Sequence, residues 1–272
     1  MKLLKNIGKY TLLTVFAIMV LFPIANALMN SFKSNADIYR VTLLPKELNF
    51  QNYINVLHNK TFYIGTLNSI IILVVSMVCA VLLTSFASYG LSRRKEKRFT
   101  FIYMFFLSAM MIPLGANMTA LYSIIKQLGL LDTRTGLVLI NITGAIPMGT
   151  MLYTGFIKSI PRELYESAMI DGCGYIKRFY LIIFPILKPT FVTQILMSSV
   201  SIWNDFFLPL LLISSPDKKP ITFAVYAFAS EHATDWGAIF AMLTLAMIPP
   251  ILLFLLSQKH FYSGAAAGAV KG

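Results

Sequence analysis

The segment whose residue types and spacing point most clearly to a task is the stretch 160–185, which lies between two long apolar runs. Pro161 suits the first turn of a helix. Glu163 and Glu166 fall in the N-terminal half of that helix, where its dipole favours negative charge. Gly172 can take the left-handed conformation that ends a helix. We therefore expect a short amphipathic helix, a turn and a second short helix, an arrangement suited to docking against another protein.

Two small residues of this helix, Ser167 and Ala168, are expected to be exposed. Small side chains would allow a partner surface to approach the helix closely. An ordinary amphipathic surface helix without a partner is the competing interpretation of the same pattern.

Residue sets for catalysis or metal binding are missing from the sequence. His58, His232 and His260 are far apart and lack metal-ligand spacing. Cys79 and Cys173 form neither a disulfide framework nor a metal pattern. No Ser–His–Asp or Cys–His set occurs in its usual sequence context, and the glycines of the tail lack the G-x-x-x-x-G-K-[ST] pattern that binds phosphate. We expect no catalysis, no metal site and no cofactor bound by this chain.

The composition indicates a membrane protein. The chain of 272 residues is 57% hydrophobic and 12% charged, whereas soluble domains contain about 25% charged residues. Backbone amides must be paired inside lipid, so each long apolar run should be a helix. Six runs long enough to cross a bilayer are expected at approximately 10–32, 63–91, 99–122, 136–157, 190–212 and 237–258. The expected fold is an all-α membrane protein with one transmembrane domain, residues 1–272.

The distribution of basic residues indicates the orientation of these spans. With the N-terminus inside, the inner segments contain 15 of the 23 Lys and Arg residues, and the outer segments contain 8. Cytoplasmic loops carry an excess of Lys and Arg. Both termini and the 160–185 loop, between spans four and five, are therefore expected in the cytoplasm. The net charge of +12 then belongs to the inner membrane face rather than to a nucleic-acid surface.

The 160–185 loop resembles the signature of a transporter family. Permease subunits of binding-protein-dependent ABC importers carry E-A-A, three residues, G, nine residues and I-x-L-P. The matching positions in this chain are Glu166, Ser167, Ala168, Gly172, Ile182, Phe184 and Pro185. Two of them depart from the family pattern, with serine in place of the second alanine and phenylalanine in place of leucine, and both changes preserve the small or apolar character.

Other segments resemble the smaller permease subunit of maltose-type carbohydrate importers. They are Met111–Pro113 in the third span, Leu128–Leu130 in the following outer loop, the W-N-x-F pattern at Trp203–Phe206 and the tail Gln258–Gly272. This resemblance implies a permease subunit that forms half of a sugar or oligosaccharide pathway in the cytoplasmic membrane of a bacterium.

The same resemblance implies the partners and the coupling residues. The partners would be a homologous second permease, two ATPase subunits that bind ATP and Mg²⁺, and an extracytoplasmic sugar-binding protein. The loop helix would be the coupling helix that docks on an ATPase subunit. Its coupling residues would be Glu166, Ser167, Ala168, Asp171 and Gly172.

Five further residues are candidates for the sugar pathway: Asn68, Ser69, Trp203, Asn204 and Asp205. Polar side chains within spans also hydrogen-bond neighbouring helices, and tryptophans are common at membrane interfaces. A packing role therefore competes with a pathway role for these residues.

Other functions compete with sugar import. One is an ABC permease for another small solute. Another is an ion-driven secondary transporter, which would favour inverted repeats and intramembrane charge partners. A membrane enzyme is the third, and the missing catalytic residues count against it.

Overall fold

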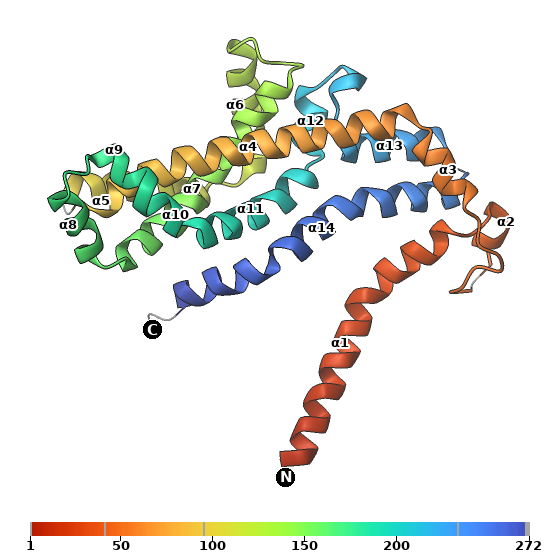
Figure 1. Ribbon diagram of the computed structural model, residues 1–272. Helices are drawn as coiled ribbons and strands as arrows, with labels where there is room; N and C mark the ends of the chain where they lie inside the picture. The colour runs from red at the N-terminus through yellow and green to blue at the C-terminus, as the bar shows by residue number, and fades with distance from the viewer. Residues whose placement is uncertain (1, 41, 95, 233, 270–272) are drawn as a thin grey trace. The chain divides into compact units, whose positions relative to one another are not determined.

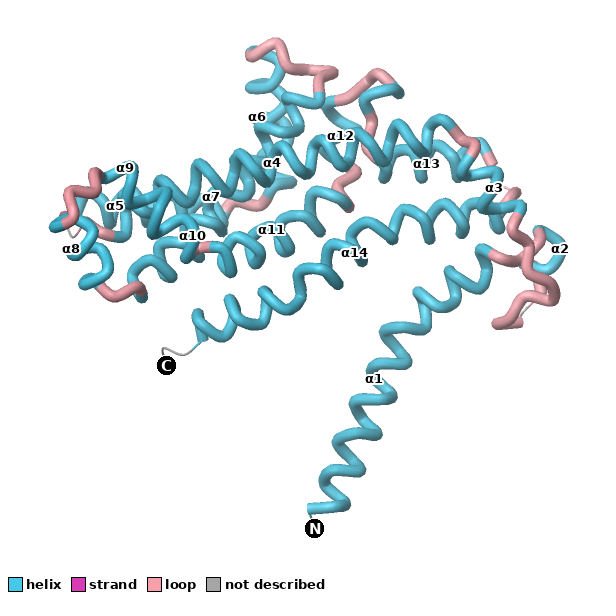
Figure 2. The backbone as a smooth tube through the Cα atoms, in the orientation of Figure 1, coloured by secondary structure: helices cyan, strands magenta, loops and turns pink. Residues whose placement is uncertain are grey.

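The described part of the chain folds into helices joined by turns and short loops. The computed structural model describes residues 2–40, 42–94, 96–232 and 234–269, and these ranges contain no strand (Figures 1 and 2). The all-α prediction is confirmed for them. The end of the predicted tail pattern, 270–272, lies outside the described residues.

One compact unit comprises residues 1–66 and 221–248. Its helices are α1 (Lys2–Ser31), α2 (Asn35–Ile38), α3 (Gln51–Leu57), the start of α4 (Lys60–Ser92), α13 (Ile221–Glu231) and the first part of α14 (Trp236–Ala269). The buried Asn52 amide on α3 donates to the Ser31 carbonyl at 2.8 Å and the Lys33 carbonyl at 2.9 Å. These two bonds fix the chain that leaves α1 against α3.

The other unit comprises residues 67–220 and 249–272, including the remainders of α4 and α14. Its other elements are α5 (Lys97–Ser108), η1 (Ala109–Met111), α6 (Leu114–Gln127), α7 (Arg134–Ser159), α8 (Arg162–Ile170), α9 (Tyr175–Arg178), the π-helical η2 (Phe179–Ile183), α10 (Phe184–Ile186), α11 (Lys188–Trp203), α12 (Phe207–Leu212) and η3 (Pro216–Lys218).

A buried carboxamide joins α7 to α11 inside this unit. Gln194 has no exposed surface. Its Nε2 donates to the Ala145 carbonyl at 3.0 Å, and its Oε1 accepts from the Tyr153 hydroxyl. Gly149 leaves room for it, because a Cβ at that position would overlap the carboxamide of Gln194. The small residue therefore permits a close approach of two apolar helices, as is common in membrane bundles.

Four described helices are long and apolar enough to cross a membrane, and the number rises to six if each of two bent pairs counts as one span. The third predicted span, 99–122, is divided between α5 and α6, and the helical segments of this pair meet at 110°. Pro113 follows Ile112, whose extended backbone (φ −92°, ψ 114°) is the conformation that a residue before proline prefers.

The fifth predicted span, 190–212, is also divided. Helix α11 ends at Trp203 and α12 begins at Phe207. The helical run before it, 175–186, is bent by 68° relative to α11.

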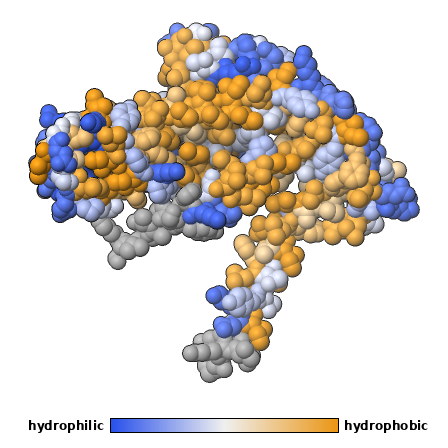
Figure 3. Space-filling model, viewed as in Figure 1, coloured by the Kyte–Doolittle hydropathy of each residue, from blue (hydrophilic) through white to orange (hydrophobic). Residues whose placement is uncertain are grey.

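The surface of this second unit has an apolar flank. Figure 3 shows hydrophobic residues along the visible flank of α4. Val74, Val78 and Leu83 of this helix are exposed. Hydrophilic and hydrophobic residues are mixed around α8, at the end where α5, α8 and α9 lie together in Figure 1. Exposed apolar side chains along a helix are expected where the helix crosses lipid.

Candidate functional site: the docking loop and the opposite polar network

Helix α8 ends in a turn that requires glycine. Gly172 has φ +74°, the left-handed region. Its N–H donates to the Met169 carbonyl at 3.0 Å, and the Cys173 N–H donates to the Ala168 carbonyl at 2.9 Å. This pair of bonds is the Schellman motif, which satisfies the last carbonyls of a helix. The predicted helix stop at Gly172 is therefore confirmed.

The predicted coupling residues differ in exposure. Glu166, Ser167, Asp171 and Gly172 are exposed, so a partner can reach them. The expectation that Ala168 is exposed is wrong, since only 7% of its surface is accessible. Ala168 lies three residues after Tyr165, so the two share one face of the helix, and that face turns toward the protein.

Tyr165 connects α8 to the ends of two other helices. The Arg178 guanidinium, on α9, lies 4.3 Å from the centre of the Tyr165 ring, and the Arg93 guanidinium, directly after α4, lies 5.4 Å from it. Both distances are within the range of a cation–π interaction. The ring also packs on the buried cluster that contains Tyr89, Tyr153 and other residues of α4, α7 and α11.

The pathway candidates lie in different surroundings. Ser69 and Asp205 line one small cavity, together with residues of α4, α7, α11 and α12. Trp203 is buried, whereas Asn204, at the break between α11 and α12, is exposed. The structure thus brings Ser69 and Asp205 together and gives Asn204 a surface position.

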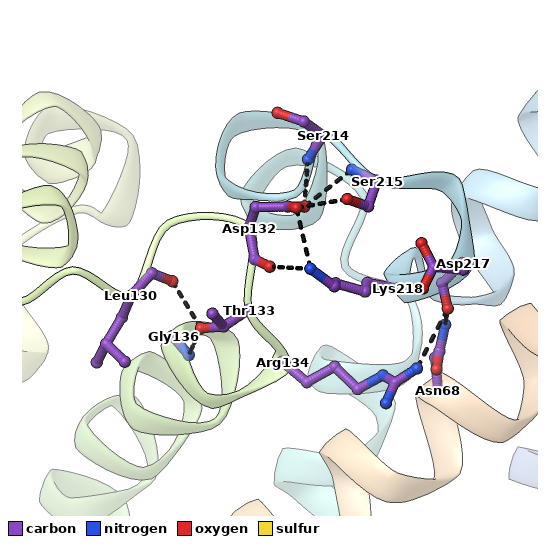
Figure 4. Close-up of polar contacts among 10 residues, drawn as sticks. All are labelled: Asn68, Leu130, Asp132, Thr133, Arg134, Gly136, Ser214, Ser215, Asp217 and Lys218. Carbon is purple, nitrogen blue, oxygen red and sulfur yellow. Dashed lines mark hydrogen bonds and ion pairs between the residues drawn. The ribbon is translucent and has the colours of Figure 1, made fainter.

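Asn68 hydrogen-bonds to the loop that follows α12. Its side chain is 1% exposed, and its Nδ2 donates to the carbonyls of Asp217 and Lys219, both at 2.9 Å (Figure 4). The Arg134 guanidinium donates to the same Asp217 carbonyl at 3.2 Å. These contacts fix the loop after α12 on α4 and on the start of α7.

Asp132 accepts several hydrogen bonds from the same loop. Its carboxylate accepts from the N–H of Ser214 at 3.0 Å, from the N–H and the hydroxyl of Ser215, and from the Lys218 ammonium at 3.0 Å (Figure 4). The bonds from Ser215, then those from Lys218 and Ser214, hold the pKa of Asp132 well below its usual value. Asp132 also has φ +56°, which an aspartate tolerates better than most residues. This residue therefore ties the α6–α7 loop to the α12–α13 loop.

Replacing Asn68 by leucine is expected to lower the thermal stability of the purified protein. The carbonyls of Asp217 and Lys219 would lose the Asn68 donor, and a typical intramolecular hydrogen bond contributes about 0.5–1.5 kcal/mol. The sugar preference that the family resemblance implies should stay unchanged, because the carboxamide is occupied by the loop. Thermal unfolding and sugar competition measure the two effects, and Asn204→Leu, at an exposed position, is the control for the unfolding measurement. An unchanged melting temperature together with altered sugar preference would contradict this assignment and favour a pathway role.

The sequence reasoning did not single out Asp132, Arg178 or Arg93 as site residues. Thr133 caps α7 by accepting from the Gly136 N–H at 3.1 Å, but this local pattern gives no signal for the contacts of Asp132 with the loop after α12. The contacts of Tyr165 with the two arginines have no local signal either, since they join different helices.

Taken together, the described residues form an all-helical chain with several helices long and apolar enough to cross a membrane, and with a surface loop built on α8. The described residues contain no group of three His, Cys, Asp or Glu residues that could hold a metal ion. The loop helix offers exposed acidic and small residues and a glycine-dependent end, which are features of a contact surface.

Comparisons with known proteins agree with this class. The chain is 33% identical to the melibiose/raffinose/stachyose import permease of Bacillus subtilis over 92% of its own length and 91% of that protein. It is 34% identical to a probable permease for starch degradation products of Thermoanaerobacterium thermosulfurigenes, over 94% of each chain. The crystal structure of a bacterial ABC transporter involved in alginate import contains a chain with a TM-score of 0.82 and 25% identity, covering 95% of this chain and 96% of that one.

Residues 80–266 match the family described as the binding-protein-dependent transport system inner membrane component, and the chain belongs to that family. It is accordingly a multi-pass membrane permease subunit of an ABC transporter, and not an enzyme. ATP hydrolysis in this family resides in a separate subunit.

Proposed function

We propose that this permease imports a sugar or oligosaccharide across the cytoplasmic membrane of a bacterium. It would form half of the translocation pathway, with a homologous second permease forming the other half. Two ATPase subunits would bind ATP and Mg²⁺ and hydrolyse the ATP. An extracytoplasmic sugar-binding protein would deliver the substrate. The permease itself would bind no cofactor.

The observation that carries this proposal is the α8 loop. It occurs in a chain whose relatives are named for sugar import. The exposed Glu166, the Schellman turn at Gly172 and the family signature occur together in one segment. Two of the relatives are named for the import of melibiose, raffinose and stachyose and of starch degradation products. A second structure with the same fold, 15% identical, contains an alginate ABC transporter with an alginate-bound periplasmic protein.

The site residues take separate roles in this proposal. Glu166, Ser167, Asp171 and Gly172 would contact the ATPase, while the buried Ala168 would seat α8 on its own subunit. Ser69, Asp205 and Asn204 would lie along the sugar pathway, with Trp203 supporting them from a buried position. Asn68 would act by fixing the outer loop.

Purification of the permease with its ATPase and second permease tests this function. Sugars presented with the binding protein should stimulate ATP hydrolysis and enter proteoliposomes. Melibiose, raffinose and maltose oligomers serve as probes, and a polyamine and a phosphonate serve as non-sugar controls. Stimulation of ATP hydrolysis by a control solute, with no response to any sugar, would reject the carbohydrate assignment. The chain would then be an ABC permease for another solute.

The proposed topology has six spans and both termini in the cytoplasm. In a variant without Cys79 and Cys173, Glu96→Cys should react with a membrane-impermeant thiol reagent only from the cytoplasmic side. Ser214→Cys should react only from outside. Both side chains are exposed, so access depends on the side of the membrane. Labelling of Glu96→Cys in intact cells would contradict this orientation.

A further inference from the structure

Helix α8 has a specific side-chain connection to the rest of its unit. Its charged and small residues Glu163, Glu166 and Ser167 are exposed, whereas Tyr165 packs on the buried cluster formed by α4, α7, η2 and α11. Leu164 and Met169 are exposed. A displacement of α8 by a docked partner would therefore reach the other helices through Tyr165.

Two guanidinium groups from different helices lie against the Tyr165 ring. Arg93 directly follows α4, and Arg178 is the last residue of α9, immediately before the π-helical turn that leads toward α11. Their distances from the ring centre are 5.4 and 4.3 Å. The ring thus touches the end of one candidate span and the approach to another.

The Tyr165 ring is a favourable neighbour for two guanidinium groups that have buried nitrogens. Arg178 is 7% exposed, and its Nε and Nη1 are buried without a hydrogen-bond partner among the described residues. Arg93 has the same feature at Nε and Nη2. The ion pairs found in the described residues involve neither of them. A buried charge without an acidic partner is costly, and the face of an aromatic ring partly compensates for this cost.

Neighbouring rings pack closely around Tyr165. Tyr89, which has no exposed surface, lies on α4 with its ring centre 6.2 Å from that of Tyr165. Tyr89 also contacts Tyr175 at 4.6 Å and Phe179 at 5.6 Å. Densely packed side chains transmit a displacement rather than absorb it.

We propose that Tyr165, held by Arg93 and Arg178, is the positioning residue that transmits movement of α8 to α4 and α11. The inference rests on the proposed function, because it requires an ATPase subunit that moves α8. Tyr165 does not touch the sugar or ATP in this proposal. It determines how much of the ATPase movement reaches the transmembrane helices.

The test compares transport with ATP hydrolysis in the assembled transporter reconstituted in proteoliposomes. Tyr165→Leu should retain the ATPase subunit and its ATP hydrolysis but lower sugar uptake at least tenfold, so that the ATP consumed per sugar rises at least tenfold. Tyr165→Phe keeps the ring and should retain at least half of the wild-type uptake. Tyr180→Leu is the matched control, because Tyr180 is exposed on the neighbouring turn and contacts phenylalanines. The ATP that Tyr180→Leu consumes per imported sugar should equal that of the wild type.

A second variant separates coupling from folding. If Tyr165→Leu reduces the amount of assembled transporter, Tyr165→Leu combined with Arg178→Met should restore assembly, because the orphaned buried charge is gone, while uptake per ATP stays low. Equal losses of uptake and ATP hydrolysis in the assembled double variant, or uptake per ATP at the wild-type level, would overturn the proposal. A wild-type transporter that imports no sugar would instead reject the proposed function, independently of these variants.

Discussion

Replacing Gly172 by valine is expected to abolish sugar uptake and to weaken the retention of the ATPase subunit. The backbone at this position has φ +74°, which a β-branched residue adopts only at a cost of about 1–3 kcal/mol. That cost reduces the population of the native turn roughly 5- to 150-fold. Uptake in cells and co-purification of the ATPase measure the result. The variant should still insert and pair with the second permease.

Gly174 provides the control for this prediction. A Cβ at either glycine would meet no atom within 4 Å, but Gly174 has φ −63°, which any residue tolerates. Gly174→Val should therefore transport near the wild-type rate. Glu166→Ala should show a milder form of the Gly172→Val defect, because it removes one contact and leaves the turn intact. Full transport and full ATPase retention by both Gly172→Val and Glu166→Ala would show that α8 is an ordinary surface helix.

Replacing Asp132 by alanine is expected to loosen the loop 214–219 and to lower the melting temperature by several degrees. The change removes the acceptor for Ser214, Ser215 and Lys218. Because the folded state holds the pKa of Asp132 below its ordinary value, this stabilisation is present above about pH 4. It decreases as the pH falls through the folded-state pKa. Thermal unfolding between pH 3 and 7 should therefore show a variant defect that is largest near neutrality.

Asp217 is the matched control for Asp132. Its carbonyl accepts from Asn68 and Arg134, while its side chain is exposed. Asp217→Asn should leave both the melting temperature and its pH dependence unchanged. Identical melting temperatures of Asp132→Ala and Asp217→Asn at every pH would mean that the carboxylate of Asp132 does not stabilise the contact between the two loops.

The sequence predicted the features that depend on local residue patterns. Apolar runs predicted the long helices, and Gly172 marked the end of α8, because a helix and its stop are encoded within a few residues. The angle between α5 and α6 at Pro113 could not be predicted from local residue patterns. Proline indicates a break, but the direction of the next helix depends on packing.

The contacts that join distant segments could not be predicted in the same way. Asn68 was a pathway candidate because it is polar within a span, yet its partners Asp217 and Lys219 are main-chain carbonyls, which leave no trace in residue types. Ala168 was expected on the outer face because it is small. Its burial follows from its position on the same helix face as Tyr165, whose ring lies against Arg93 and Arg178.

The long separation between Asn68 and its partners has a consequence for biosynthesis. The first partner, Asp217, lies 149 residues further along the chain. A ribosome adds about 5–20 residues per second, so roughly 7–30 s pass between the synthesis of Asn68 and that of Asp217. Throughout this interval α4 lacks the loop whose carbonyls accept from the Asn68 carboxamide. This end of the helix is therefore completed late, after the fifth apolar run has been made.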